Sequence, residues 1–234
     1  KGAVNLKSFD LAKRTTPELI ELLGHGDKWH RQTALRLLGD RKDVSALPAL
    51  KKRLAGALGQ AALEALWAVN LSGGFTPDFA GVTIGHADPH VRLWTVRLLG
   101  DERVLTEPLA KRLARLAKRE PHVEVRSQLA AMAKRLPAPQ ALPIIRALME
   151  HDSYAWYIYQ PLMVWWALES KVGQDASEVL ELFEDESVWQ KSLARQHLLS
   201  RLIRRFAKAG TRADLINGAR LFELAPDADA ARIL

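Results

Sequence analysis

The chain has 234 residues, of which 48% are apolar and 26% charged, and this composition is that of a folded globular protein rather than a disordered one. It contains no cysteine, which excludes disulfides, thiolate metal sites, covalent haem attachment and cysteine nucleophiles. Lys and Arg (34) exceed Asp and Glu (27), and the net charge of +7 favours an acidic partner or nucleic acid. Because no run approaches the ~18 consecutive apolar residues of a membrane span, we expect no membrane insertion.

An internal repeat dominates the sequence. Nine of the seventeen residues in 24–40 recur 61 positions later in 85–101, including the shared ending Arg-Leu-Leu-Gly-Asp. Weaker matches 28 positions after Gln32 and 34 positions after Arg92 indicate a period of 28–35 residues, which is enough for two helices and two turns. Self-similarity of this kind predicts an architecture in which each repeat buries its apolar face against its neighbours.

In chain order, the helical periodicity predicts six helix pairs and part of a seventh. The pairs are 17–24 with 28–38, 47–56 with 59–70, 77–84 with 89–99, 107–119 with 122–135, 140–150 with 161–171, and 177–184 with 188–208. A last helix is expected near 212–224. No stretch alternates with a period of two, so we expect no sheet.

Local signals support these helix ends. Thr16-Pro17 and Thr76-Pro77 each place a capping residue before a proline at the first helical position. Asp88-Pro89 does the same for a second helix. Gly39 and Gly100 are predicted to end the second helices as left-handed residues.

The string Asp88-Pro89-x-Val91-Arg92, followed by Thr95-Val96-x-Leu98-Leu99, resembles the second-helix signature of HEAT repeats. This resemblance implies that the Asp caps the helix and that the Arg reaches a neighbouring repeat in a polar ladder. Asp27 with Arg31 matches the pattern, with His30 in place of Val, and Arg126 matches with the Asp displaced. The implied fold is an all-α, right-handed α-solenoid (an α-α superhelix) in which residues 1–234 form one HEAT-repeat domain.

Residues 86–101, 62–68, 125–130 and 165–169 resemble one class of HEAT segment more closely. That class belongs to the PVC-type haem-binding CxxCH proteins, secreted bacterial multidomain proteins with a dehydrogenase-like propeller and a c-type cytochrome. The resemblance implies a periplasmic or secreted location, and no haem function is carried over because Cys-x-x-Cys-His is absent here. Since the sequence starts at Lys1 and ends within a helical pattern, we expect a segment of a longer protein.

Two sets of residues are candidates for binding. The first is aromatic and lies in a predicted loop over 152–160 that precedes Pro161: Tyr154, Trp156, Tyr157 and Tyr159. These rings form either a platform for a partner or a loop folded onto its own repeats, and of the adjacent Trp165 and Trp166 we expect at least one to be buried. The second set is basic and lies on two helices: Lys111, Arg112, Arg115, Lys118, Arg119, Arg201, Arg204, Arg205 and Lys208. It forms either a solvated outer face or, if neighbouring repeats align it, a track for a phosphate backbone.

Catalytic and metal-binding patterns are absent from the sequence. His25, His86 and His151 recur at equivalent turns, but equivalent positions of a repeat are too far apart to share an ion, and we expect each to donate to a local carbonyl. No G-x-S-x-G, H-E-x-x-H or glycine-rich phosphate loop occurs. We therefore expect no enzyme and no cofactor. The predicted function is a scaffold that binds a protein partner or neighbouring domains of its own chain, and the alternative is nucleic-acid binding by helices 107–119 and 188–208.

Overall fold

The computed structural model describes residues 10–151 and 159–234, and within these ranges all regular structure is helical. The chain divides into two compact parts, an N-terminal part to Trp94 and a C-terminal part from Thr95. The boundary lies inside helix α6, and each part is described by itself. The predictions of an all-α fold and of no strand are confirmed for the described residues.

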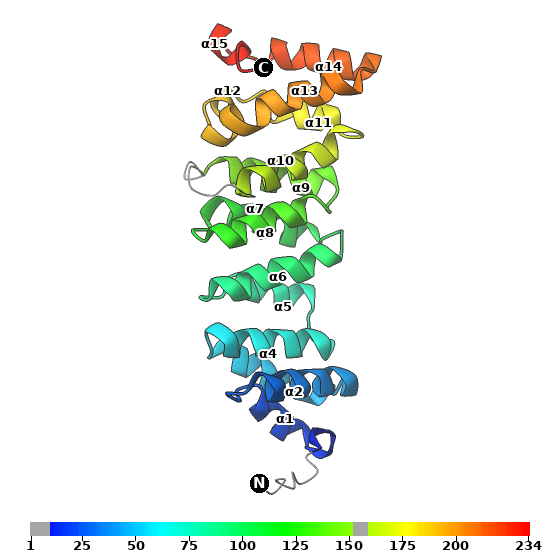
Figure 1. The fold of residues 1–234 in the computed structure, drawn as a ribbon, viewed down its shortest axis with the longest axis vertical. Helices are drawn as coiled ribbons and strands as arrows, with labels where there is room; N and C mark the ends of the chain where they lie inside the picture. The colour runs from blue at the N-terminus through cyan, green and yellow to red at the C-terminus, as the bar shows by residue number, and fades with distance from the viewer. Residues whose placement is uncertain (1–9, 152–158) are drawn as a thin grey trace, which may run out of the picture. The chain divides into compact units, whose positions relative to one another are not determined.

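The N-terminal part holds the first helix pairs (Figure 1). A short 3-10 turn, Leu11–Lys13, precedes α1 (Thr16–Leu22) and α2 (Lys28–Arg41), and another, Val44–Ala46, precedes α3 (Leu47–Ala55) and α4 (Gly59–Leu71). The third pair is α5 (Pro77–Thr83) and α6 (Pro89–Asp101). The second helices α2 and α4 pack against each other, and so do the two helices within each of the first two pairs. Leu19, Leu38 and Leu50 are fully buried between them.

The C-terminal part continues with α7 (Glu107–Arg119) and α8 (Val123–Ala133), then α9 (Ala138–Met149) and α10 (Tyr159–Val172). After these come α11 (Ala176–Glu181), α12 (Glu186–Trp189), a π-helical stretch (Ala194–Leu198), α13 (Leu199–Ala209), α14 (Arg212–Glu223) and α15 (Ala228–Ala231).

Contacts arrange the helices of this part in two rows. The first helices α7, α9, α11 and α14 each pack against the next, and the second helices α8, α10 and α13 do the same. Helix pairs join the rows, for example α8 with α9 and α13 with α14. Large side chains such as Leu113, Leu129 and Phe206 are fully buried between the rows. This arrangement defines two outward surfaces, one for each row.

Two predicted helix starts differ from the structure by one or two residues. The side chain that caps α1 is that of Thr15, which with Glu18 forms a reciprocal capping box, so Pro17 is the second helical residue rather than the first. Helix α10 begins at Tyr159, two residues before Pro161. Proline is tolerated there because the first four N–H groups of a helix have no intrahelical partner.

The predicted helix 188–208 is also wrong, because it is broken in the structure. Helix α12 ends at Trp189, and the chain becomes helical again only at Ser192, just before the π-helical stretch that leads into α13. Such a stretch holds an extra residue per turn. It lets Trp189 point into the core while Leu198 and Leu199 remain buried in the row.

Gly39 and Gly100 do not end their helices, and this prediction is wrong. Both lie within regular helix, and α2 ends instead at Arg41, where the cap residue Lys42 has a left-handed φ of 47°. A Cβ at position 39 would lie 3.1 Å from the Leu71 Cβ, and one at position 100 would lie 3.2 Å from the Met132 Cγ. The glycines are therefore needed for the close approach of one second helix to the next.

This close approach predicts a loss of stability for alanine at either glycine. Met132 is only 1% exposed and has nowhere to move, so Gly100→Ala is expected to destabilise the C-terminal part by about 1–3 kcal/mol. The atom nearest to position 39 is the Leu71 Cβ, which rotation of the side chain does not move, so Gly39→Ala is expected to destabilise the N-terminal part by a similar amount, about 1–3 kcal/mol. Urea unfolding of both variants measures the losses, and unchanged stability would contradict the packing argument.

Candidate binding surface

The predicted repeat positions form a recurring geometry at the turn inside a helix pair. Asp27 caps α2 by accepting from the Trp29 N–H at 2.7 Å, and Asp88 accepts in the same way from the His90 N–H at 2.8 Å. Burial raises the pKa of Asp88, but N–H donors from Gly59, His90 and Val91 outweigh it and hold the pKa below its usual value. The prediction that these residues cap their helices is confirmed.

The arginine of each repeat closes its own turn. Arg31 Nη1 donates to the carbonyls of His25 and Gly26 at 2.8 and 2.9 Å. Arg92 makes the same two bonds six and five residues back, to His86 and Ala87 at 2.8 and 3.0 Å. Arg126 repeats them with Glu120 and Pro121 at 2.9 and 2.8 Å. One guanidinium thus satisfies two turn carbonyls that helical hydrogen bonds do not reach.

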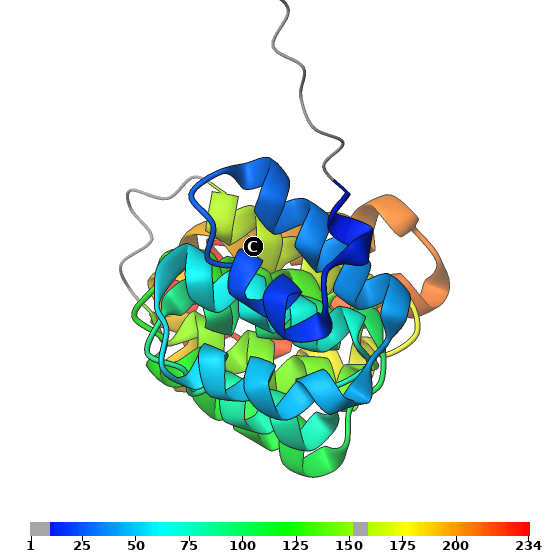
Figure 2. The ribbon, with the colours of Figure 1, turned by 90° about the horizontal axis from the view of Figure 1, so that it is seen from below.

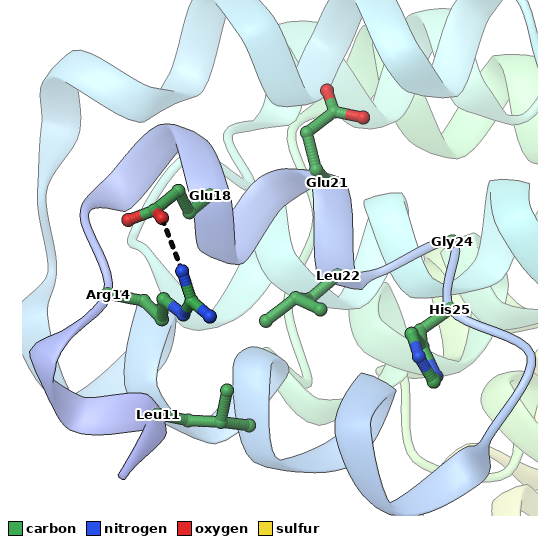
Figure 3. A pocket seen from close by; sticks show the side chains of 7 residues that line it. All are labelled: Leu11, Arg14, Glu18, Glu21, Leu22, Gly24 and His25. Atoms are coloured by element: carbon green, nitrogen blue, oxygen red, sulfur yellow. Dashed lines mark hydrogen bonds and ion pairs between the residues drawn. The ribbon is translucent and has the colours of Figure 1, made fainter. Parts of the chain in front are cut away.

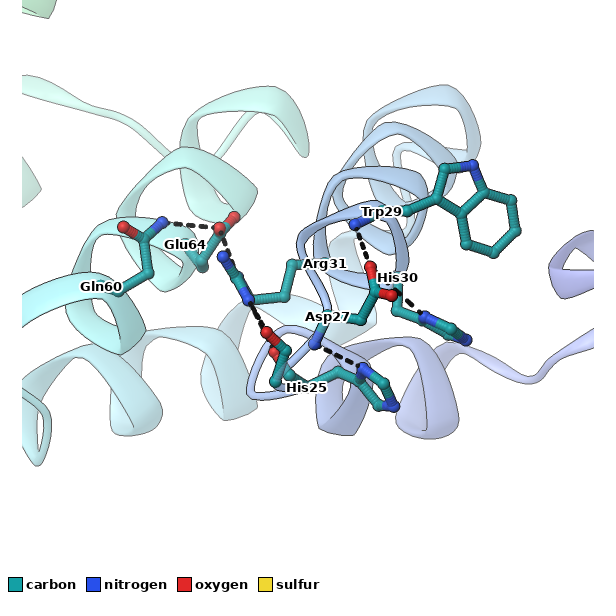
Figure 4. Close-up of polar contacts among 8 residues, drawn as sticks. His25, Asp27, Trp29, His30, Arg31, Gln60 and Glu64 are labelled. Atoms are coloured by element: carbon teal, nitrogen blue, oxygen red, sulfur yellow. Dashed lines mark hydrogen bonds and ion pairs between the residues drawn. The ribbon is translucent and has the colours of Figure 1, made fainter.

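Contact with the neighbouring repeat is visible at Arg31. Its Nε lies 3.2 Å from Glu64 Oε1 on α4, and Gln60 donates to the same oxygen at 2.7 Å (Figure 4). Glu64 is 2% exposed, and this pairing is what permits a carboxylate at a buried position. The contact with a neighbouring repeat that the resemblance implies for this arginine is therefore present at this joint.

Sequence reasoning missed the equivalent residue of the sixth pair. Asp185 caps α12 by accepting from the Ser187 N–H at 2.9 Å, and four residues later the arginine position holds Trp189. The indole N–H donates to the Phe183 carbonyl at 2.9 Å, six residues back, as the arginines do. The four-residue spacing after Asp185 was the available signal.

Two of the three turn histidines, His86 and His151, join repeats rather than donating locally, which corrects our expectation for them. His86 Nε2 lies 3.3 Å from the Leu54 carbonyl on α3, and His151 Nε2 lies 2.7 Å from the Ala117 carbonyl on α7. In both cases the carbonyl belongs to the first helix of the preceding pair. These histidines are therefore fixed at joints between repeats and are not grouped as metal ligands; the described residues contain no such group.

Only one of the four aromatic candidates lies within the described residues. Tyr154, Trp156 and Tyr157 lie outside the described residues. Tyr159 is 72% exposed at the start of α10, and Trp166 is 45% exposed further along the same helix, whereas Trp165 is buried. The expectation that at least one of the adjacent tryptophans is buried is thus confirmed. Tyr159, Met163 and Trp166 follow at spacings of four and three, which places them on one face of α10.

The five basic residues of α7 are all exposed: Lys111, Arg112, Arg115, Lys118 and Arg119. Lys111 pairs with Glu107 at 2.6 Å. Lys111 and Arg115 line a groove between α7 and α9 whose floor includes Ala110, Ala114 and Pro143. This side of the molecule is the surface of the first-helix row.

The basic residues of α13 are engaged with their own surroundings. Arg201 donates to the His197 carbonyl at 2.6 Å, and Arg204 donates to the Ser200 carbonyl at 2.9 Å. Arg205 lies 3.7 Å from Glu169 on α10, and Lys208 is exposed at the end of the helix. Burial, with a smaller contribution from Arg201, lowers the pKa of His197.

The structure does not bring the two basic sets together. Helix α7 belongs to the first-helix row and α13 to the second-helix row, and one repeat, α9 with α10, lies between their repeats in the chain. The surface that does combine aromatic and basic residues is that of α10 and α13. We call it the aromatic face and define it as Tyr159, Met163, Trp166, Glu169, Arg201 and Arg205.

A buried lysine joins α10 to the end of α8. Lys171 on α10 is 6% exposed, and its Nζ donates to the carbonyls of Lys134 and Leu136 at 3.0 and 2.6 Å, at the end of α8. Burial lowers the pKa of Lys171, and the nearby Asp175 opposes this shift. The ammonium thus ties the end of one second helix to the next.

Comparison of the chain with protein-family models, with curated proteins and with solved structures finds no match. Among the described residues, no helix has the length and apolar character required to cross a lipid bilayer.

Proposed function

We propose that the chain is a non-catalytic scaffold of HEAT-type repeats, built as a right-handed α-solenoid, that binds a protein partner or a neighbouring domain of its own polypeptide. Support comes from the repeated turn geometry of Asp27 with Arg31 and Asp88 with Arg92, and from the two rows of helices in the C-terminal part. Because the sequence resembles HEAT segments of secreted multidomain redox proteins, we propose that the chain is a segment of a protein of that kind.

The observation that carries the binding proposal is the exposure of Trp166. A tryptophan that is 45% exposed leaves a large apolar surface in water, and Tyr159 and Met163 extend it along α10. Tryptophan, tyrosine and arginine are the residues that most often dominate protein–protein binding energies. Arg205, held by Glu169, borders this apolar strip and would orient a carboxylate of the partner.

Trp166→Ala is therefore expected to weaken partner binding by about 2 kcal/mol or more, roughly 30-fold, without unfolding the chain. The partner would be found by comparing proteins retained by the wild type and by the variant from an extract of the source cell. Isothermal titration with the purified partner then gives the dissociation constants.

Val82→Ala is the matched control, because Val82 is also an exposed apolar residue (71%) but lies on α5 in the N-terminal part, outside the aromatic face. The control should retain every partner of the wild type. If the wild type and Trp166→Ala retain the same proteins with equal affinity, the aromatic face is not the binding surface.

Nucleic-acid binding is the second candidate, and the exposed cations of α7 are what favour it. It requires duplex affinity that falls by about 0.9 log units per log unit of salt for each phosphate contact. Since α13 lies in the other row, reversing the charges of Arg112 and Arg115 alone should abolish such binding, while reversing Arg205 should not.

A further inference from the structure

The groove between α7 and α9 follows one face of α7. It has a volume of about 450 Å³, and its lining on α7 is Glu107, Ala110, Lys111, Ala114 and Arg115. Steps of three, one, three and one keep these residues on one stripe of a helix that has 3.6 residues per turn. At 1.5 Å per residue the stripe is about 12 Å long, which is the length of about four residues of extended chain.

The opposite wall of the groove is the first half of α9, where Pro139 and Pro143 are exposed. Pro143 lies inside the helix and has no N–H, so α9 does not supply the usual donor to the Pro139 carbonyl. Gln140, between them, is bonded to both the N–H and the carbonyl of Leu105, at 3.0 and 2.8 Å. This wall therefore offers apolar rings and a main-chain acceptor.

The cations of the groove differ in what they already contact. Lys111 pairs with Glu107 at 2.6 Å, and this contact holds the pKa of Glu107 below its usual value. Among residues 10–151 and 159–234, no carboxylate lies within ion-pair distance of Arg115, nor of Arg112 three residues earlier. Like charges at this spacing destabilise a helix, so the fold gains nothing from the two arginines. A cation on an outward face carries little information by itself, but Arg115 lines a hollow.

The pocket beside α1, in the N-terminal part, has the opposite charge. The first helix pair, drawn in blue, lies nearest the viewer in Figure 2, and Figure 3 shows the pocket from close by. Its volume is about 380 Å³, and its carboxylates, Glu18 and Glu21, outnumber its one guanidinium. That guanidinium, of Arg14, donates to Glu18 at 2.7 Å. An anionic ligand is therefore suited to the groove between α7 and α9 and not to this pocket.

The lining of the groove favours a peptide over nucleic acid. Alanine and proline contact apolar side chains, whereas single strands require aromatic rings for base stacking, and none of the described residues that line the groove is aromatic. Alternate side chains of an extended peptide point to the same side and lie about 6.6 Å apart. Lys111 and Arg115 are separated by about 6 Å along α7, so their spacing matches such a chain.

We propose that the groove between α7 and α9 binds an extended acidic segment of a protein partner, in which carboxylates alternate with apolar side chains. One carboxylate pairs with Arg115, and the preceding one meets Lys111, whose ammonium has three donors. The apolar side chains between them pack against Pro139 and Pro143. This surface belongs to the first-helix row, so the inference does not rest on the aromatic face, which belongs to the second-helix row.

Fluorescence anisotropy of labelled synthetic peptides, titrated with the full chain, tests the proposal. The first probe has about six residues, enough to span the groove, in which Glu alternates with Val, and both of its ends are blocked. It is expected to bind, and to bind more weakly as salt rises, because exposed cations are screened. Probes with Gln for every Glu, or Ser for every Val, should each bind at least tenfold more weakly, since each lacks one kind of contact.

Variants of the chain locate the site. Arg115→Glu should weaken binding of the first probe at least tenfold, whereas Lys208→Glu, the same charge reversal on exposed α13, should not change it. Ala114→Phe fills the groove without changing the charge and should weaken binding as strongly. Circular dichroism checks that each variant is folded, and if Ala114→Phe is not, the Ser probe still tests the apolar lining. Trp166→Ala should bind the probe like the wild type, which separates this surface from the aromatic face.

Four results would overturn the proposal. The first is no binding of the Glu–Val probe up to about 1 mM. The second is equal weakening by Arg115→Glu and Lys208→Glu, because net charge alone would then explain the binding. The third is unchanged binding both to a folded Ala114→Phe and by the Ser probe, because the peptide would then contact only surface cations. The fourth is tighter binding of an oligonucleotide with the charge of the probe, abolished by Arg115→Glu, which would make the surface a nucleic-acid site.

Discussion

Replacing Trp189 with alanine is expected to lower the free energy of unfolding of the C-terminal part by about 3–5 kcal/mol. The side chain is fully buried against Phe183, with ring centroids 6.2 Å apart. Its removal leaves a cavity between α11 and the π-helical stretch, and it also leaves the Phe183 carbonyl without its donor. Urea unfolding followed by circular dichroism measures the loss.

A second variant separates packing from hydrogen bonding at this position. Trp189→Phe keeps most of the ring and removes the N–H, so it should cost about 1–2 kcal/mol. Hydrogen exchange should then be faster in residues 183–198 than in α8 or α9. The free energy of unfolding of Trp189→Ala could instead lie within about 1 kcal/mol of the wild-type value, which is roughly the contribution of one hydrogen bond. In that case Trp189 does not hold the turn of the sixth pair closed.

The helices were largely predictable from the sequence because their signals are local. Apolar residues at helical spacing and capping residues such as Asp27, Thr76 and Thr211 determine where helices begin, and the predicted last helix 212–224 matches α14 (Arg212–Glu223). The break after Trp189 was not predictable in this way. It depends on what the indole touches across the turn, which periodicity does not encode.

Contacts between helices account for the other errors. Gly39 and Gly100 carry a helix-end signal in sequence, yet their function is to let a neighbouring helix approach, and only the positions of Leu71 and Met132 reveal it. The histidines were assigned to local carbonyls because the sequence does not show that Leu54 and Ala117 lie beside the turns. The basic residues were correctly expected to be exposed on α7, but their separation by helix row follows from packing alone.

The arrangement of repeats also explains why binding surfaces are hard to predict from the sequence of such a protein. Every helix is amphipathic, so an exposed lysine or arginine is expected on each outward face and carries little information. An exposed tryptophan at position 166 is more informative, because the same helix face holds Ala131 in the preceding repeat, 35 residues earlier. Departures from the repeat, rather than the repeat itself, indicate where function lies.

Arg126→Ala is expected to destabilise the C-terminal part by about 2–3 kcal/mol, since hydrogen bonds from a charged donor contribute more than neutral ones. Arg126 is 5% exposed, and its guanidinium satisfies the Glu120 and Pro121 carbonyls at the turn between α7 and α8. Alanine supplies no donor, and water reaches this turn poorly. Urea unfolding measures the loss of stability, and faster amide hydrogen exchange in α8 should show that the loss is localised at this turn.

Arg135→Ala provides the matched control just beyond the end of α8. Arg135 pairs with Asp101 at 2.6 Å, but the two side chains are 48% and 64% exposed, and exposed pairs of this kind contribute about 0–1 kcal/mol. A larger loss at Arg126 than at Arg135 would show that closing the turn, and not charge pairing, is what the repeat requires of this residue type. Equal losses of stability would contradict the explanation by turn closure. The hydrogen bond of the uncharged Trp189 to its turn would then be unrelated to the role of these arginines.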